Sequence, residues 1–229
     1  MIRPRLLDLF CCAGGAAMGY HRAGFDVVGV DINPQPRYPF AFIQHDALTL
    51  DPRFLAMFDA VHASPPCQGY TDLRHAKGAI GAPRLIVPVR AMLDANGAPY
   101  VIENVDGAEH EMRDPVRLCG SMFDLGAQGC QLQRHRWFEA KFPLDAPDCR
   151  HTDAPVVGVY GGHARKRSAK HGGRGTKDIW QGGHKAAASE ALAIDWMTLA
   201  EMSEAIPPDY TRFIGRQLLA HLNSKDIAA

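Results

Sequence analysis

Residues 5–19, RLLDLFCCAGGAAMG, place a short apolar run directly before a stretch of small residues. The run at 5–10 has the length and composition of a buried strand, and the segment after it has helical character. Small residues at such a turn let the backbone approach a ligand closely. On its own the turn also fits an ordinary strand-to-helix connection or a nicotinamide-cofactor fold, although the usual Gly-x-Gly spacing is absent.

Three further short runs rich in β-forming residues follow, at 26–31, 58–63 and 100–103. Connections long enough for crossovers separate them, so the pattern predicts an α/β fold with a mostly parallel sheet. Ligands of such sheets bind beyond the carboxyl ends of the strands. Three of the four runs end in chemically unusual segments, at residues 11–15, 64–68 and 103–105.

Two aspartates stand where strands are expected to end. Asp31 comes about 20 residues after the small-residue turn, at a position from which a carboxylate accepts hydrogen bonds from ribose hydroxyls. Asp46 follows a further possible strand, where a carboxylate can accept from an exocyclic adenine amine. A lone aspartate at such a position is also a common helix cap or turn residue.

Residues 64–69, SPPCQG, hold Cys67 behind two prolines that stiffen the loop. A thiol held in this way at the mouth of the sheet is a candidate nucleophile, provided that its surroundings lower its pKa. Glu103 ends the fourth run, where an apolar site would raise the pKa of its carboxyl group. The alternatives are a small apolar residue filling a turn for Cys67 and a solvent-facing or capping role for Glu103.

Composition places the chain among ordinary globular proteins. Its 229 residues fit one domain with a small appendage, and 25 basic residues balance 25 acidic ones, so any nucleic-acid surface must be local. Six cysteines without a secretory leader before the first apolar run lead us to expect a reduced, cytoplasmic setting. No apolar stretch approaches the roughly 20 residues of a membrane span, so we expect a soluble protein.

The composition changes after about residue 155. Residues 160–185 combine many glycines with seven Lys or Arg, three His and one acidic residue, which is typical of a long basic loop or a minimal subdomain. A helix is predicted over 195–202, ended by the proline pair at 207–208, and a last helix from about residue 211 to 221. We therefore expect three parts, with bounds of 1–154, 155–195 and 196–229.

Five motifs occur in the order found in DNA cytosine-5 methyltransferases, and they occupy residues 10–15, 66–68, 103–105, 134–136 and 207–215. The chain resembles a short member of that family, of the sort often found in phages. The resemblance implies a Rossmann-like, S-adenosylmethionine-dependent methyltransferase fold with a mostly parallel sheet and a reduced target-recognition segment. Residues 1–154 would form the catalytic domain, 155–195 the recognition insert, and 196–229 helices that return to the catalytic domain.

The resemblance also implies roles for individual residues. Cys67 would add to C6 of a cytosine flipped out of the duplex, while Glu103 holds or protonates N3, and carbon 5 receives the methyl group. The implied catalytic residues are Cys67, Glu103, Arg134 and Arg136. The implied cofactor is S-adenosyl-L-methionine, and its site residues are Phe10, Cys11, Ala13, Gly14, Gly15, Asp31, Ile32, Asp46, Ala47 and Pro65.

The expected partner is double-stranded DNA. We expect the protein to be a monomer and not to bind a membrane. Basic residues of the insert are candidates for phosphate contacts, which hold DNA without reading its sequence, so we expect a short or loosely specified target site. The candidate DNA-binding residues are Gln68, Arg165, Lys166, Arg167, Lys170, Arg174 and Lys177. We expect no metal, because a zinc site from Cys149, His151 and His163 would fit no standard finger spacing.

Three other functions remain open at this point. An RNA cytosine-5 methyltransferase acting on transfer RNA would use the same constellation. An inactive nucleic-acid clamp could retain the fold, but it has no need of Cys67, Glu103 and Asp31. A nicotinamide oxidoreductase would explain the small-residue turn and Asp31, but it leaves the motifs at 66–68 and 103–105 without a purpose.

Overall fold

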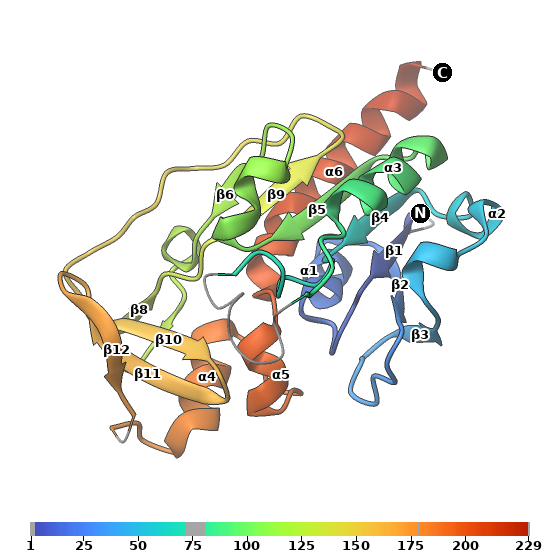
Figure 1. Cartoon of the computed structure of the whole chain (residues 1–229). Coiled ribbons are helices and arrows are strands. Elements are labelled where there is room, and N and C mark those ends of the chain that lie inside the picture. Colours follow the sequence, from blue (N-terminus) through green and yellow to red (C-terminus); the bar gives the residue numbers. More distant parts are fainter. Residues whose placement is uncertain (1–2, 72–80, 178, 229) are drawn as a thin grey trace.

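The computed structural model describes residues 3–71, 81–177 and 179–228. Its main element is a seven-stranded sheet flanked by helices, and a second, five-stranded sheet stands beside it (Figure 1). In spatial order, the strands of the large sheet are β3 (Ala41–Gln44), β2 (Asp26–Asp31), β1 (Arg5–Leu9), β4 (Ala60–Ala63), β5 (Tyr100–Asn104), β9 (Arg136–Ala140) and β6 (Val116–Leu118).

Five neighbouring strands of the large sheet, from β3 to β5, run parallel. Strand β9 pairs antiparallel with both β5 and β6. The structure thus confirms the α/β class, the mostly parallel sheet and the strands predicted from the four apolar runs. The further strand expected before Asp46 is β3.

Helices cover both faces of the large sheet. The α-helices are α1 (Gly15–Ala23), α2 (Pro52–Leu55), α3 (Ile86–Asn96), α4 (Gly183–Leu192), α5 (Leu199–Glu204) and α6 (Pro208–Ala228). The 3₁₀ helices are η1 (Ala47–Thr49), η2 (Asp106–Glu111) and η3 (Gly120–Phe123). None of the helices in the described part of the chain has both the length and the apolar character needed to cross a membrane.

Alternating side chains of β1 divide the core between the two faces, as the two-residue period of a strand requires. Leu6 belongs to the apolar cluster that contains α1 and α6, whereas Leu7 and Leu9 belong to the cluster that contains α2 and α3. Helices α1 and α6 approach each other closely at Gly19. A Cβ at this position would collide with the start of α6, so the approach requires glycine. The strand is buried on both sides, which explains why apolar residues occupy neighbouring positions in it.

The basic segment forms a minimal subdomain rather than a long loop. Strands β10 (Val156–Tyr160), β11 (His163–Ser168) and β12 (Gly172–Thr176) pair antiparallel in succession, and α4 follows them. The indole Nε1 of Trp180 donates to the carbonyl of Ala164 at 2.9 Å, which ties the connection before α4 to the sheet. Two more strands of this sheet, β7 (Gly126–Ala127) and β8 (Cys130–Leu132), come from before residue 155.

The predicted bounds of the C-terminal helices were wrong. Thr198 and Glu201 form a reciprocal capping box, with the Thr198 N–H donating to the Glu201 carboxylate at 2.7 Å, so α5 begins at Leu199 rather than near residue 195. Pro208 opens α6 instead of closing the preceding helix. Proline is well suited to the first helical position, where its missing N–H breaks no hydrogen bond.

A buried ion pair ties α3 to β9. Arg90 Nε and Nη2 lie 2.7 and 2.6 Å from the two carboxylate oxygens of Glu139, and both side chains are almost completely buried. The Arg113 N–H and the Tyr100 hydroxyl also donate to this carboxylate. A carboxylate held by four donors stabilises the joint between the parallel and antiparallel parts of the sheet.

We expect Glu139→Ala to lower the free energy of unfolding by about 3–5 kcal/mol, because it leaves the Arg90 guanidinium buried without its partner. Urea unfolding followed by circular dichroism measures this change. Arg53→Ala is the matched control, since it removes an ion pair with Asp51 that is open to solvent. Equal unfolding midpoints for the two variants would show that the buried pair does not hold the joint.

Candidate active site

A cavity of about 270 Å³ lies beyond the carboxyl ends of β1, β2, β4 and β5. Loops that follow these four strands form most of its wall, and the segment from Met197 to Ile206 closes it from the other side. The predicted site residues that line it are Phe10, Cys11, Ala13, Gly15, Asp31, Ile32, Pro65, Cys67, Gln68, Glu103 and Arg136.

The turn between β1 and α1 has an unusual backbone. Phe10 and Cys12 have φ angles of 58° and 44°, and Gly14 has a φ of 83°. Left-handed conformations are costly for residues with a Cβ, so they concentrate at functional sites where surrounding contacts hold them. Here the Cys11 N–H donates to the Val30 carbonyl at 3.1 Å. This hydrogen bond fastens the turn to β2.

Asp31 joins this turn to the end of β2. Its carboxylate accepts from the Cys12 N–H at 3.0 Å and from the Asn33 N–H at 2.9 Å, and the side chain is buried. The next residue, Ile32, is 62% exposed although it is apolar, and it borders the cavity. A carboxylate beside an exposed apolar side chain suits a ligand with hydroxyl groups and a flat apolar part.

Three predicted cofactor residues do not line the cavity. Gly14 packs against Tyr38 instead. Asp46 caps η1, with one carboxylate oxygen accepting from the Leu48 N–H at 3.0 Å, and Ala47 is buried behind it. The capping alternative for Asp46 thus describes its contacts in this structure.

Cys67 lies on the stiff loop after β4, where it is half-buried. The side chain of Asn104 donates to the Pro65 carbonyl at 2.9 Å, and the Tyr70 N–H donates to the Cys67 carbonyl at 2.9 Å. Burial raises the pKa of the Cys67 thiol, the Glu103 carboxylate adds to this, and Arg136 opposes it. The thiol is therefore held in place but is mostly protonated at neutral pH.

Glu103 is buried and forms an ion pair with Arg136, whose Nε lies 3.1 Å from a carboxylate oxygen. Burial raises the pKa of Glu103, and Arg136 and a hydrogen bond from Ser64 counteract that rise. Such a carboxyl group takes up a proton more readily than a solvent-exposed glutamate does.

A chain of buried polar groups leads to Glu103 from the core. Tyr20 Oη lies 3.0 Å from His62 Nδ1, and His62 Nε2 lies 2.8 Å from Ser64 Oγ. Burial lowers the pKa of His62 to about 3, so the ring is neutral. It can therefore accept from the tyrosine and donate to the serine, whose hydroxyl then points to Glu103. The sequence analysis did not identify these residues, because nothing in their spacing marks them.

The two arginines of the 134–136 motif have different positions. Arg136 lines the cavity, whereas Arg134 is half-buried, does not line it, and donates to the carbonyls of Val159 and Ser203, both at 2.7 Å. Burial and the neighbouring Arg136 lower the pKa of Arg134 to about 9. Arg134 thereby links β10 and α5 to the large sheet and positions the motif rather than facing the cavity.

Asp8 is a further cavity residue that the sequence analysis missed. Its side chain is buried, and Tyr38 Oη lies 3.4 Å from one carboxyl oxygen. The other oxygen has no hydrogen-bond partner within the described part of the chain. Burial raises the pKa of Asp8 to about 8, so the carboxyl group is mostly protonated at neutral pH and can donate as well as accept.

The sequence analysis also did not identify the C-terminal residues that line the cavity. Met197, Glu204 and Ile206 border it, nearly 200 residues from the turn that they face. The Trp196 indole donates to the Ala13 carbonyl at 2.8 Å, which fixes this wall on the β1–α1 turn. The packing of α6 against α1, where the Thr211 hydroxyl donates to the Ala16 carbonyl at 2.8 Å, also brings these segments together.

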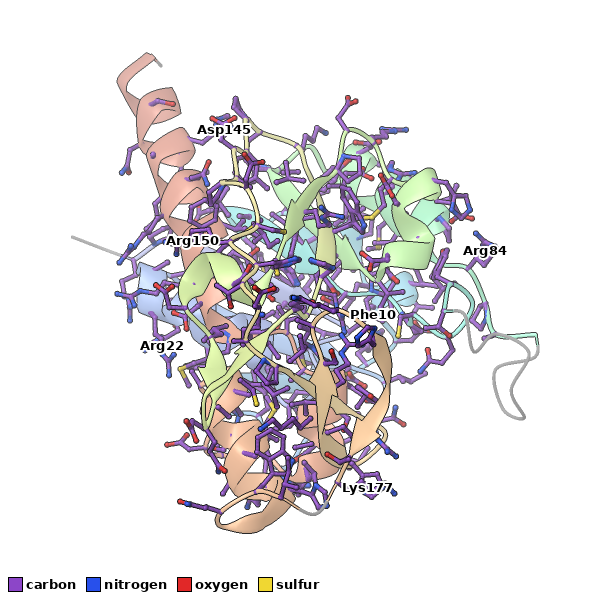
Figure 2. All side chains as sticks on the ribbon, turned by 90° about the vertical axis from the view of Figure 1, so that its left-hand side faces the viewer. Phe10, Arg22, Arg84, Asp145, Arg150 and Lys177 are labelled. Carbon is purple, nitrogen blue, oxygen red and sulfur yellow. The ribbon has the colours of Figure 1, made fainter. Side chains whose placement is uncertain are left out.

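The candidate DNA-binding residues do not form one exposed row. Lys166 and Arg167 are half-buried on β11, and Lys170 lies in the next turn, 3.9 Å from Asp153. Lys177 lies toward the end of the smaller part, away from Phe10 (Figure 2). Gln68 is exposed at the mouth of the cavity.

Two candidates differ from this description. Arg165 is buried, with its guanidinium 5.9 Å from the centroid of the Tyr160 ring, so it is not presented to a phosphate in this conformation. Arg174 lies in β12, but its side chain falls outside the described residues.

Comparison with known proteins agrees with this geometry. Residues 4–117 match the family model of C-5 cytosine-specific DNA methylases. The type II methyltransferase M.AgeI of Thalassovita gelatinovora is 28% identical over 120 residues, which are 45% of this chain and only 28% of that protein.

Two solved structures share the fold over nearly the whole chain. A protein described as a DNA modification methyltransferase encoded within a prophage (E. coli) is 15% identical with a TM-score of 0.61, covering 96% of this chain and 99% of that one. The Dnmt2 methyltransferase of S. pombe is 13% identical with a TM-score of 0.60, covering 97% and 100%. The matched family segment contains β1 to β5 and both Cys67 and Glu103, and the chain belongs to the family of C-5 cytosine-specific DNA methylases.

Proposed function

We propose that this protein transfers a methyl group from S-adenosylmethionine to carbon 5 of cytosine in double-stranded DNA, with Cys67 as the nucleophile. The observation that supports the proposal most is that Cys67, Glu103 and Arg136 share one cavity with the β1–α1 turn and Asp31. One cavity thus contains a nucleophile, a titratable carboxyl group and a turn suited to a nucleotide. A cofactor and a base bound there together could reach all three.

Several features of the cavity suit the proposed cofactor. Asp31 can accept from ribose hydroxyls, Ile32 can cover the adenine, and Asp8 offers a buried oxygen without a partner in the described chain. The amide groups at the start of α1 face the same turn. When bound, S-adenosylmethionine would supply the methyl group that carbon 5 accepts.

The residues of the chain would act on the base in sequence. A cytosine inside the duplex is shielded by its neighbours, so it must be flipped into the cavity first. The Cys67 thiolate then forms a bond to C6, and Glu103, held by Arg136, stabilises or protonates N3 as negative charge develops on the ring. After carbon 5 is methylated, loss of its proton and elimination of Cys67 restore the aromatic ring and the free enzyme.

Cys67→Ala should reduce methyl transfer to duplex DNA by at least about 1,000-fold, because it removes the thiol that the loop after β4 holds beside Glu103 and Arg136. Transfer of labelled methyl groups with sequencing of the modified cytosines measures this. DNA containing 5-fluorocytosine should also trap the wild-type enzyme covalently, since fluorine blocks the final proton loss, and it should not trap the variant.

Cys130→Ala is the control for this experiment, because Cys130 lies on β8 away from the cavity. Equal transfer by Cys67→Ala and wild type would disprove the nucleophile assignment. Label found on RNA but not on DNA would replace the DNA substrate with RNA.

The rate of covalent trapping should rise with pH between about 6 and 8. Burial raises the pKa of Cys67, so the thiolate is the minor form at neutral pH and its share grows as protons are removed. Single-turnover trapping at saturating cofactor isolates this step. A rate that falls across the same interval would mean that another ionisation limits the reaction.

Ile32→Ala should weaken cofactor binding about 10-fold, which corresponds to about 1.4 kcal/mol of lost apolar contact. Isothermal titration calorimetry with S-adenosylhomocysteine measures the affinity. Met57→Ala truncates a similarly exposed apolar side chain that does not line the cavity and should leave the affinity unchanged. Equal affinities for both variants would place the adenine elsewhere.

A further inference from the structure

Two cysteines and two histidines from separate parts of the chain converge outside the cavity. Cys119 follows β6, His135 lies between β8 and β9, and Cys149 and His151 lie on the connection between β9 and β10. One ligand atom from each residue lies within 4.8 Å of the other three. Nothing in the proposed methyl transfer uses this cluster.

The distances suit a small tetrahedral metal ion. Cys119 Sγ lies 3.2 Å from His151 Nε2, and Cys149 Sγ lies 3.7 Å from His135 Nε2. A zinc ion with Zn–S bonds of about 2.3 Å and Zn–N bonds of about 2.0 Å places tetrahedral sulfur and nitrogen ligands about 3.5 Å apart. Both cysteines are free thiols. We propose that Cys119, His135, Cys149 and His151 bind a zinc ion.

The ligand set favours zinc and a structural role. Thiolate and imidazole ligands in tetrahedral geometry are typical of Zn²⁺, and four protein ligands leave no position open for a substrate. Two thiolates balance the charge of the ion, so the complex is neutral where Cys119 is buried. His151 is exposed, which gives the ion a path from solvent.

Neighbouring groups can support the thiolates. Ser121 Oγ lies 3.2 Å from Cys119 Sγ and can donate its proton to that sulfur. The positive charge of Arg117 also lies near Cys149. Such contacts orient ligands and moderate their negative charge.

The connection that carries Cys149 and His151 is long and has no secondary structure to hold it in place. From residue 141 to 155 it contains no helix or strand, and it runs along the outside of the molecule from β9 to the smaller sheet (Figure 1). Connections of this length without secondary structure are uncommon in compact domains unless something orders them. A metal bound to two of its residues would fasten it to the ends of β6 and β8.

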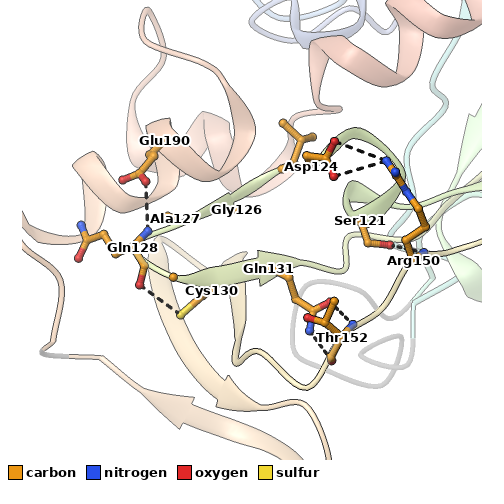
Figure 3. Close-up of a pocket in the computed structure, with 12 residues that line it drawn as sticks. Ser121, Asp124, Gly126, Ala127, Gln128, Cys130, Gln131, Arg150, Thr152 and Glu190 are labelled. Carbon is orange, nitrogen blue, oxygen red and sulfur yellow. Dashed lines mark hydrogen bonds and ion pairs between the residues drawn. The ribbon is translucent and has the colours of Figure 1, made fainter.

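Hydrogen bonds already hold the residues on either side of His151. The Arg150 N–H donates to Ser121 Oγ at 3.1 Å, and its guanidinium lies 3.4 Å from the Asp124 carboxylate (Figure 3). The Thr152 N–H donates to Gln131 Oε1 at 3.1 Å, and Gln131 Nε2 donates back to the Thr152 carbonyl at 2.7 Å. These contacts fix the backbone on both sides of His151 and so hold its side chain near the other three ligands.

The proposal revises the expectation of no metal, and it is independent of the proposed function. The sequence analysis set aside a zinc site from Cys149, His151 and His163, and His163 in fact lies on β11, where its ring meets that of His184 edge-on. Cys119 and His135 take its place, at spacings that match no standard finger. His135 also stands between the two motif arginines, so the ion would fasten the backbone that carries Arg136.

The test begins with the full chain purified without chelators. Mass spectrometry of the metal content should find about one zinc per chain in the wild type and less than about a tenth of that in Cys149→Ala and His151→Ala. Cys130→Ala and His171→Ala are the matched controls, since both residues lie outside the cluster, and they should retain the zinc. Circular dichroism checks that each variant is folded.

A second measurement replaces zinc with Co²⁺. Wild-type protein should show thiolate-to-cobalt charge-transfer bands and the intense visible bands of tetrahedral cobalt, and His151→Ala should lose the tetrahedral pattern. His151 is exposed, so this variant keeps the test valid if Cys149→Ala does not fold.

Three results would overturn the proposal: zinc retained in both ligand variants, wild-type protein with neither zinc nor the cobalt spectrum, or a disulfide between Cys119 and Cys149. None of these readouts depends on methyl transfer. A failure of the zinc proposal is therefore distinguishable from a failure of the proposed function.

Discussion

The parallel pairing of β1 with β2 on one side and with β4 on the other is the constraint on which the rest of this structure depends. Parallel strands end at the same edge, so the turn after Leu9, the carboxylate of Asp31 and the loop with Cys67 must meet there. Strand β5 adds Glu103 to that edge. Backbone pairing therefore brings together the side chains that face the cavity.

The antiparallel strand β9 extends this arrangement toward the smaller sheet. It carries Arg136 to Glu103, and its Glu139 is held by the buried Arg90. Arg134, just before the strand, donates hydrogen bonds to the carbonyls of Val159 and Ser203. One short segment therefore joins the cavity edge of the large sheet, the smaller sheet and α5, and its displacement would disturb all three.

The proposed zinc ligands surround the same segment from outside. His135 is one of them, and the other three come from the end of β6 and from the connection to β10. The polar chain from Tyr20 through His62 and Ser64 supports Glu103 from the opposite side, inside the core. The cavity wall is thus held from two directions by interactions that the proposed chemistry does not itself use.

The sequence by itself determined the parallel sheet, the strand ends and the residues that stand at them, because strand burial and strand termini leave local patterns in apolar runs, prolines and small residues. It also determined Cys67 and Glu103 as candidates. Only the tertiary structure decided that Arg134 points away from the cavity, that Arg165 is buried, that Asp46 caps η1, and that Met197 to Ile206 close the site. The four proposed zinc ligands also required it, because contacts between distant segments depend on packing and leave no period or spacing in the chain.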